Sequence, residues 1–226
     1  MKTILLENIP FEIDLNQLMK QVRIRPESAD ARDLAALAAE AQKIARPKAL
    51  FGAAYIEERG EEEVLIDGVR MTSRVLRVNL EKAERIFPFT CTCGSELQDW
   101  GDRIEDMIWN FWAEAIKELA LRSAMEALQN HLQEEYKPGH LSTMSPGSLE
   151  NWPISQQRPL FELLGWPKEV HLTDSLLMIP TKSVSGIIFP TDGSFESCQL
   201  CPRKDCPGRR APYDESLYAR EYCPAG

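Results

Sequence analysis

Cysteines are the residues of this chain with the clearest chemical potential, and three of its six lie close together near the C-terminus. Cys198, Cys201 and Cys206 follow a C-x2-C-x4-C spacing in a segment rich in proline and glycine. Short loops of this kind can fold back so that their thiolates meet at one metal centre. A fourth ligand must come from elsewhere, and Cys93, far upstream, is the best candidate. Such a site would tie the end of the chain to its middle.

The fourth ligand and the metal both have alternatives. Cys93 comes just before a predicted helix, where the positive end of the helix dipole favours a thiolate. Cys91 would share its face if this segment is extended, and Cys223 lies close to the C-terminus. A 4Fe–4S cluster in this site would carry single electrons. A zinc ion would only hold the tail in place.

Charged residues around the tail cysteines form a local positive patch. It contains four basic side chains and one acidic side chain, namely Arg203, Lys204, Arg209, Arg210 and Asp205. Such a patch would attract an acidic partner or an electron donor. A solvated polar rim has the same composition, so the sequence leaves both interpretations open.

The overall composition excludes several classes of protein. The chain has 226 residues, 43% of them hydrophobic, and a formal net charge of −9. It therefore lacks the basic footprint of a nucleic-acid-binding protein. The apolar run at the N-terminus is too short for a signal peptide, and no segment approaches the ~20 apolar residues that span a bilayer. We expect a cytoplasmic protein without a membrane or nucleic-acid partner, in which clustered cysteines are metal ligands or redox groups.

Hydrophobic periodicity predicts the elements of the N-terminal half. We expect a helix over residues 28–46 and a strand over 49–57. The Asp67-Gly68 pair predicts a hairpin turn. Residues 69–80 then resemble one strand whose apolar phase slips, which predicts a bulge.

A long helical stretch is expected over residues 95–136. Ser95 fits the N-cap position, with Gln98 three residues later as in a capping box. A slip of the apolar stripe near Arg122 predicts either a kink or two packed helices. Three aromatic side chains are expected to pack in the core rather than to form a platform for a cofactor; they are Trp109, Phe111 and Trp112.

The C-terminal half predicts a short helix and further strands. The helix is expected over residues 156–165, and the strands over 170–173, 176–179 and 184–189. The predicted fold class is α+β, with helices, one of them long and central, packed on an antiparallel sheet. We expect one domain over residues 1–226, in which 191–226 form a cysteine-rich, metal-binding tail.

A series of residues between positions 145 and 186 carries a resemblance to a known family. These residues are Ser145-Pro146-Gly147, Trp152-Pro153-Ile154, Gln157, Leu160-Phe161, Leu163-Leu164, Val170, Leu172-Thr173, Ser175, Met178, Pro180 and Ser183-Val184-Ser185-Gly186. At these distances the series resembles the activation domain of vitamin B12-dependent methionine synthase. It is more similar still to stand-alone relatives in corrinoid methyl-transfer systems.

The resemblance implies a protein that docks on a corrinoid protein or cobalamin-dependent methyltransferase and helps to return cob(II)alamin to cob(I)alamin. It implies a cleft lined by cofactor-binding residues, namely Ser145, Pro146, Gly147, Ser183, Ser185 and Gly186. In family members an Arg-x-Ser-Pro-Gly-Tyr loop binds S-adenosylmethionine. Thr143 and Ser148 hold the arginine and tyrosine positions here. Threonine cannot supply the paired donors that arginine offers to a carboxylate, so the sequence argues against S-adenosylmethionine binding.

Three functions compete at this stage. The first is a redox protein that reduces a partner's corrinoid through a 4Fe–4S cluster and receives electrons from a low-potential donor. The second is a non-catalytic module that binds a corrinoid protein and holds its tail with zinc. The third is an S-adenosylmethionine-dependent reactivator. The sequence favours the first, and it offers no residue for catalysis by the chain itself.

Overall fold

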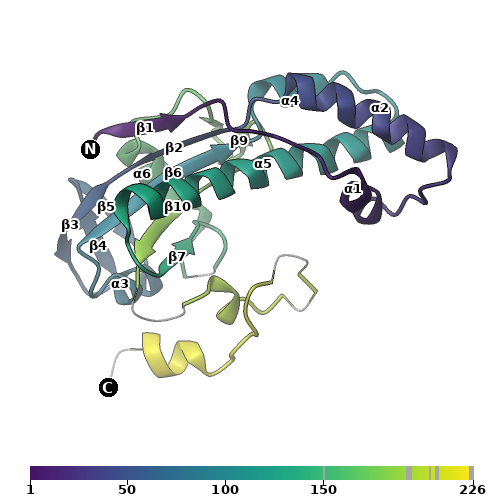
Figure 1. Cartoon of the computed structure of the whole chain (residues 1–226). Helices are drawn as coiled ribbons and strands as arrows, with labels where there is room; N and C mark the ends of the chain where they lie inside the picture. The colour runs from purple at the N-terminus through teal and green to yellow at the C-terminus, as the bar shows by residue number, and fades with distance from the viewer. Residues whose placement is uncertain (150, 192–194, 204, 207–208, 224–226) are drawn as a thin grey trace.

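The computed structural model describes residues 1–149, 151–191, 195–203, 205–206 and 209–223. It contains an antiparallel sheet, a lobe of helices beside the sheet, and one long helix that runs from the lobe across the sheet (Figure 1). The predicted α+β fold class is therefore confirmed. The tail follows the last strand and lies below the sheet in the view of Figure 1.

The main sheet is organised around strand β6. β10 pairs with one edge of β6, and β2 and β3 pair with successive parts of the other edge. β1 extends the sheet from β2, β4 and β5 extend it from β3, and β7 pairs with β10. The strands are β1 (Thr3–Leu6), β2 (Lys48–Gly52), β3 (Ala54–Arg59), β4 (Glu63–Ile66), β5 (Val69–Thr72), β6 (Arg85–Thr92), β7 (Leu141–Met144) and β10 (Ser183–Pro190). A separate hairpin joins β8 (His171–Leu172) to β9 (Met178–Ile179).

Strand β6 is covered on both faces. Phe87, Phe89 and Cys91 pack with the long helix on one face, whereas Ile86 belongs to the core cluster on the opposite face. Successive side chains of a strand point to opposite faces, so two cores need apolar residues at nearly every position. Every β6 residue after Arg85 is buried, as this arrangement requires.

The long helix α5 (Met107–Tyr136) has 30 residues and is about 45 Å long. Its first half packs on α1 (Leu15–Gln21) and α2 (Ala29–Ile44) in the helical lobe, and its second half packs on the sheet. The helix is unbroken at Arg122, so the predicted division into two helices at that position is wrong. The apolar stripe changes phase there because the helix changes partner, from the lobe to the sheet. The stretch predicted over residues 95–136 is instead divided at residues 102–106, between a short helix and α5.

The aromatic residues in the first turns of α5 are only partly buried. Trp112 is 4% exposed and packs in the helical lobe, whereas Trp109 and Phe111 are 39% and 57% exposed. The prediction that all three pack in the core is therefore wrong for Trp109 and Phe111, because a helix buries only the face that meets its partner.

Two predicted boundaries are also wrong. β5 ends at Thr72, and residues 74–79 form helix α3 (Arg74–Asn79), which Ser73 caps through a 3.0 Å bond from the Leu76 amide. The apparent bulge is therefore a change from strand to helix period. Gly94, not Ser95, is the N-cap of α4 (Ser95–Gly101).

Other predictions of local structure are confirmed. Ser28 caps α2 by accepting from the Ala31 amide at 3.2 Å, and the Asp67-Gly68 turn joins β4 to β5. A short helix, α6 (Gln157–Leu163), lies within the predicted range 156–165. No helix in the described ranges has the length and apolar character required to cross a membrane.

Candidate functional site

The loop that follows β7 is a tight turn that depends on glycine. Gly147 has φ of 81°, in the left-handed region, and its amide donates to the Trp152 carbonyl at 2.7 Å. A Cβ added there would lie 2.7 Å from Ile154 Cδ1. Ser148 closes the turn by donating from Oγ to the Ser145 carbonyl at 2.6 Å. The local sequence therefore fixes the path of Ser145 and Pro146.

The structure brings this loop against strand β10. A Cβ added at Gly186 would lie 2.4 Å from the Met144 carbonyl oxygen and 2.8 Å from Ser145 Oγ. Only glycine leaves room for this approach. The loop at Ser145 and strand β10, which the resemblance assigns to one cleft, are therefore neighbours in space.

Polar side chains line the part of β10 next to this contact. Ser183 Oγ lies 2.9 Å from Thr92 Oγ1, and Gln157 Nε2 donates to Ser185 Oγ at 3.4 Å. Ser185 is also the cross-strand neighbour of Thr90. These contacts link α6 to β6 and β10 through polar groups in an otherwise apolar core.

Two atoms of this polar group have no hydrogen-bond partner among the described residues. They are Thr90 Oγ1 and Gln157 Oε1, on side chains that are only 1% and 3% exposed. An unpaired buried polar atom costs about 1–3 kcal/mol, so a bound molecule that paired with both atoms would recover that cost. The sequence predicts none of Thr90, Thr92 and Gln157 as a site residue, although Gln157 belongs to the series that carries the resemblance. The alternation of Thr90 with Thr92 along one strand is the signal that points to them.

The tail cysteines lie on a loop folded around one guanidinium group. Arg209 donates to the carbonyls of Cys198 (2.9 Å), Cys201 (3.1 Å), Ala211 (3.1 Å) and Arg203. Arg209 therefore organises the loop from within instead of facing a partner.

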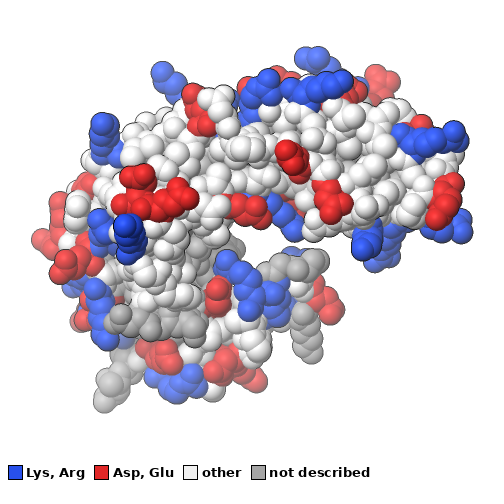
Figure 2. Space-filling model, viewed as in Figure 1, with Lys and Arg blue, Asp and Glu red and all other residues white. Residues whose placement is uncertain are grey.

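The other basic side chains of this segment have different surroundings. Arg210 pairs with Glu196 at 3.0 Å, and its amide donates to Cys198 Sγ at 3.4 Å. Burial raises the pKa of the Cys198 thiol, but the amides of Arg210 and Ala211 lower it, and the net shift is downward. Lys204 is outside the described residues. Basic side chains gather on the tail beside a hollow that separates it from the helical lobe (Figure 2).

The structure does not bring Cys93 to the tail cysteines. Cys93 is buried in the core of the helical lobe, and burial raises the pKa of its thiol to about 12 despite the nearby Lys117. Thr92, its neighbour, pairs with the first residue of β10, whereas the tail follows the last. The 8 residues of that strand span about 26 Å. The set of four thiols that combines Cys93 with the tail therefore does not fit this geometry.

The remaining candidate ligands are also apart. Cys91 is fully buried against α5, and burial raises the pKa of its thiol. Cys223 is exposed, just after the last helical turn. Within the described ranges, no three histidine, cysteine, aspartate or glutamate side chains are grouped closely enough to hold a metal ion. The tail trio shares a loop, but its thiols do not converge.

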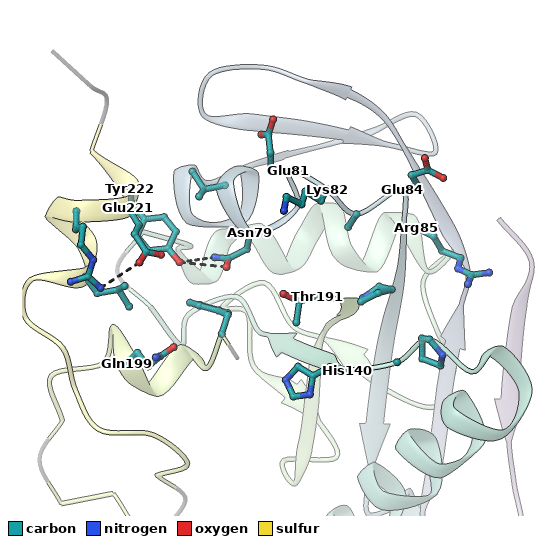
Figure 3. A pocket seen from close by; sticks show the side chains of 18 of the residues that line it. Asn79, Glu81, Lys82, Glu84, Arg85, His140, Thr191, Gln199, Glu221 and Tyr222 are labelled. Atoms are coloured by element: carbon teal, nitrogen blue, oxygen red, sulfur yellow. Dashed lines mark hydrogen bonds and ion pairs between the residues drawn. The ribbon is translucent and has the colours of Figure 1, made fainter. Parts of the chain in front are cut away.

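A separate cavity of about 1020 Å³ lies between the tail and the sheet. His140 and Thr191 are on one wall, and Asn79 and Tyr222 are joined by hydrogen bonds at one side (Figure 3). Side chains of both charges border the cavity, so its charge does not select one class of ligand.

The tail also contacts the strand where the resemblance expects arginine. Ser197 Oγ donates to the Thr143 carbonyl at 3.2 Å, and Ser142 Oγ donates to the Phe195 carbonyl at 2.8 Å. The tail therefore follows β7 immediately before the loop at Ser145.

Comparisons with known proteins identify the fold. No protein-family model matches the chain, and no curated protein matches it. A crystal structure of the MetH reactivation domain bound to AdoHcy is similar, with a TM-score of 0.58 and 16% identity. The match covers 86% of this chain and 80% of that one. This likeness shows that the chain has a reactivation-domain-like fold, which agrees with the α+β arrangement around a long helix.

Proposed function

We propose that this chain docks on a corrinoid-carrying protein or methyltransferase and supports the return of its cobalt from cob(II) to cob(I). The observation that carries this proposal is the contact between Gly186 and Ser145. It joins the two segments on which the resemblance rests, within a fold like that of the MetH reactivation domain.

In this proposal the cofactor-binding site lies at the contact between Gly186 and Ser145. It is bordered by the six residues predicted from sequence: Ser145, Pro146, Gly147, Ser183, Ser185 and Gly186. Thr90 Oγ1 and Gln157 Oε1 lie beside Ser185, on the face of the sheet opposite the contact between Gly186 and Ser145, and have no partner among the described residues. The role of the chain is to bind and orient, and we assign it no catalytic residue.

The supply of electrons is a separate part of the proposal. Residues 191–226 would act as an appendage of a single domain, with Cys198, Cys201 and Cys206 as ligands of a 4Fe–4S cluster. The three thiols share one loop, but Arg209 binds the carbonyls of that loop and the thiols do not converge, so a cluster would require the loop to rearrange. Cys93 is left out, and Cys223 is the remaining candidate for the fourth position. Such a cluster exchanges single electrons, whereas zinc would serve only as a structural staple.

Metal analysis tests this part. Protein purified without oxygen should contain iron and sulfide, and Cys201→Ser should lose both while the buried Cys93→Ser keeps them. A content of one zinc ion and no sulfide per chain would indicate a binding module instead of a redox protein. Protein free of both metals would remove the metal from the proposal.

Docking is tested independently of the metal. The chain is mixed with a cob(II)-loaded corrinoid methyltransferase and a low-potential reductant, and complex formation and the cobalt spectrum are followed. Gly186→Ala should weaken the complex and slow the formation of cob(I), because its Cβ would push the loop at Ser145 away. A failure of the unmodified chain to bind would refute the proposed function.

The S-adenosylmethionine alternative has its own experiment. The similar structure contains AdoHcy, but Thr143 lacks the paired donors that would hold the carboxylate of such a ligand. We expect no heat of binding with either S-adenosylmethionine or AdoHcy at millimolar concentration. Saturable binding would restore the third hypothesis.

A further inference from the structure

A small pocket lies between the second half of α5 and the edge of the sheet. It has a volume of about 220 Å³ and is lined by seven residues, namely Gln129, Gln133, Gly139, His140, Leu141, Thr143 and Ile188. Pockets that take a whole cofactor or a drug-sized molecule have volumes of roughly 300–1,000 Å³. This pocket therefore suits one side arm of a larger molecule.

The pocket is next to the proposed cofactor-binding site. Thr143 on β7 pairs with Ile188 on β10, and Ile188 packs in the core cluster under α5. Ser145 and Gly186, which are in contact, each lie two residues from this pair. Alternate residues of a strand share a face and are about 7 Å apart. A molecule bound at Gly186 and Ser145 could therefore reach the pocket with a short arm.

The pocket combines an apolar floor with uncharged polar side chains. Ile188 is 1% exposed, and Leu141 is partly buried in the same cluster. Gln129 and Gln133 are one helical turn apart on α5, about 6 Å along its axis. None of the seven lining residues is an aspartate, glutamate, lysine or arginine. A charged arm would find no ion-pair partner among them, so the pocket favours a neutral polar group.

The hydrogen-bonding groups of the pocket select among neutral arms. Gln133 Nε2 donates to the Gly139 carbonyl at 3.0 Å, which leaves Gln133 Oε1 as an acceptor. The amide of Gln129 and the hydroxyl of Thr143 have no hydrogen-bond partner within the described ranges. A primary carboxamide can donate from its nitrogen to Gln133 Oε1 and accept at its oxygen from the Thr143 hydroxyl. A carboxylate has only acceptors and would oppose Gln133 Oε1.

We propose that this pocket binds a primary carboxamide arm of the partner's corrinoid. The inference rests on the proposed function, because it takes the ligand from there. The corrin ring carries several such arms at its rim, each an amide on a short apolar stem. The stem would lie on Leu141 and Ile188 while the amide pairs with Gln133 and Thr143. Binding of one arm would fix the rotation of the ring relative to the chain.

A titration with methylcobalamin tests the pocket without the partner. At millimolar methylcobalamin, the side-chain amide signals of Gln129 and Gln133 should shift in NMR spectra. The signal of Asn130, the next residue on α5, should not shift, because this exposed side chain is outside the pocket. Methylcobalamin in which the bound arm has been hydrolysed to a carboxylate should lose the effect.

Binding of the cob(II)-loaded methyltransferase gives the second test. Gln133→Leu and Thr143→Val should each weaken the complex about tenfold, because each removes one hydrogen bond to the arm. Asn130→Leu is the matched control and should leave the affinity unchanged. Gln129→Arg should favour a partner loaded with the carboxylate form, since arginine pairs with carboxylates. Circular dichroism should confirm that all variants keep their helix content.

The outcomes separate this inference from the proposed function. A complex that Gln133→Leu leaves unchanged, or that forms equally well with every carboxylate form, overturns the inference while the proposed function stands. If the partner without corrinoid binds as tightly and still responds to Gln133→Leu, the corrinoid is overturned as the source of the carboxamide. If no complex forms, the proposed function fails, and methylcobalamin that shifts neither glutamine signal then overturns the inference as well.

Discussion

Tyr222 is the side chain that fastens the end of the tail, and its removal makes a quantitative prediction. It is 2% exposed, and its hydroxyl accepts from Asn79 Nδ2 at 3.1 Å and lies 3.4 Å from Asn79 Oδ1. Its ring stacks on Tyr218, and its carbonyl accepts from Arg74 Nε at 3.0 Å. These contacts join the last helical turn to α3.

Tyr222→Phe removes the hydroxyl and keeps the ring. Asn79 retains its 2.8 Å bond to the Val75 carbonyl but loses its partner on the tail. Loss of such a partner costs about 1–2 kcal/mol, which raises the population of detached tail about 5- to 30-fold. The melting temperature of the whole chain should change less, because the tail detaches before the sheet unfolds.

Limited trypsin cleavage at Arg220 measures this population. When detachment is fast relative to cleavage, the cleavage rate follows the open fraction, so it should rise about 5- to 30-fold in Tyr222→Phe. Tyr218→Phe is the control, because that hydroxyl makes one exposed bond to Asn151 at 3.2 Å. Its effect should be below about threefold. Equal rates in both variants would refute the reasoning.

The same contact predicts a dependence on pH. Burial raises the pKa of the Tyr222 phenol, so the attached tail favours the neutral form. This contribution to attachment is complete below pH 10, where an unfolded tyrosine is neutral, and it is lost as the pH rises through the higher pKa of the attached state. The methyl NMR signals of buried Leu217 should therefore shift above pH ~10 in the unmodified chain but not in Tyr222→Phe. An identical pH response in both proteins would contradict this account.

Further predictions concern the core and the thiols. Cys91 and Cys93 should react with a thiol reagent at neutral pH only after denaturation, whereas the tail cysteines should react in the native state, as counted by mass spectrometry; early loss of either buried thiol would contradict this burial. Leu128→Ala should lower the free energy of unfolding in urea by about 2–5 kcal/mol, because Leu128 is fully buried between α5 and the sheet. Gly186→Ala should destabilise the pairing of β7 with β10, seen as faster hydrogen exchange of the β7 amides, since its Cβ would meet the Met144 carbonyl.

Local signals in the sequence were sufficient for several elements. The helical apolar spacing and Ser28 define α2, because both capping and amphipathicity act within a few residues. The Asp67-Gly68 pair defines the β4–β5 turn, because only a few residue types accept a positive φ. In α3, the phase slip was misread as a bulge, because a short helix and a bulged strand leave similar patterns over a few residues.

The candidate site could be predicted in part. The resemblance carried by the residues from Ser145 to Gly186 implied one cleft, and the tertiary structure places Gly186 against Ser145. The unpaired atoms of Thr90 and Gln157 could not be predicted, because hydrogen-bond satisfaction depends on every neighbour in the folded core.

The identity of the fourth thiol was beyond the reach of sequence. The types and spacing of the tail cysteines showed that this segment contains possible metal ligands. The acidic composition argued against a nucleic-acid-binding protein. Only the tertiary structure decided that Cys93 is separated from the tail cysteines by the length of β10. The physical reason is that a strand fixes which end and which face each residue occupies, and that depends on partners distant in the chain.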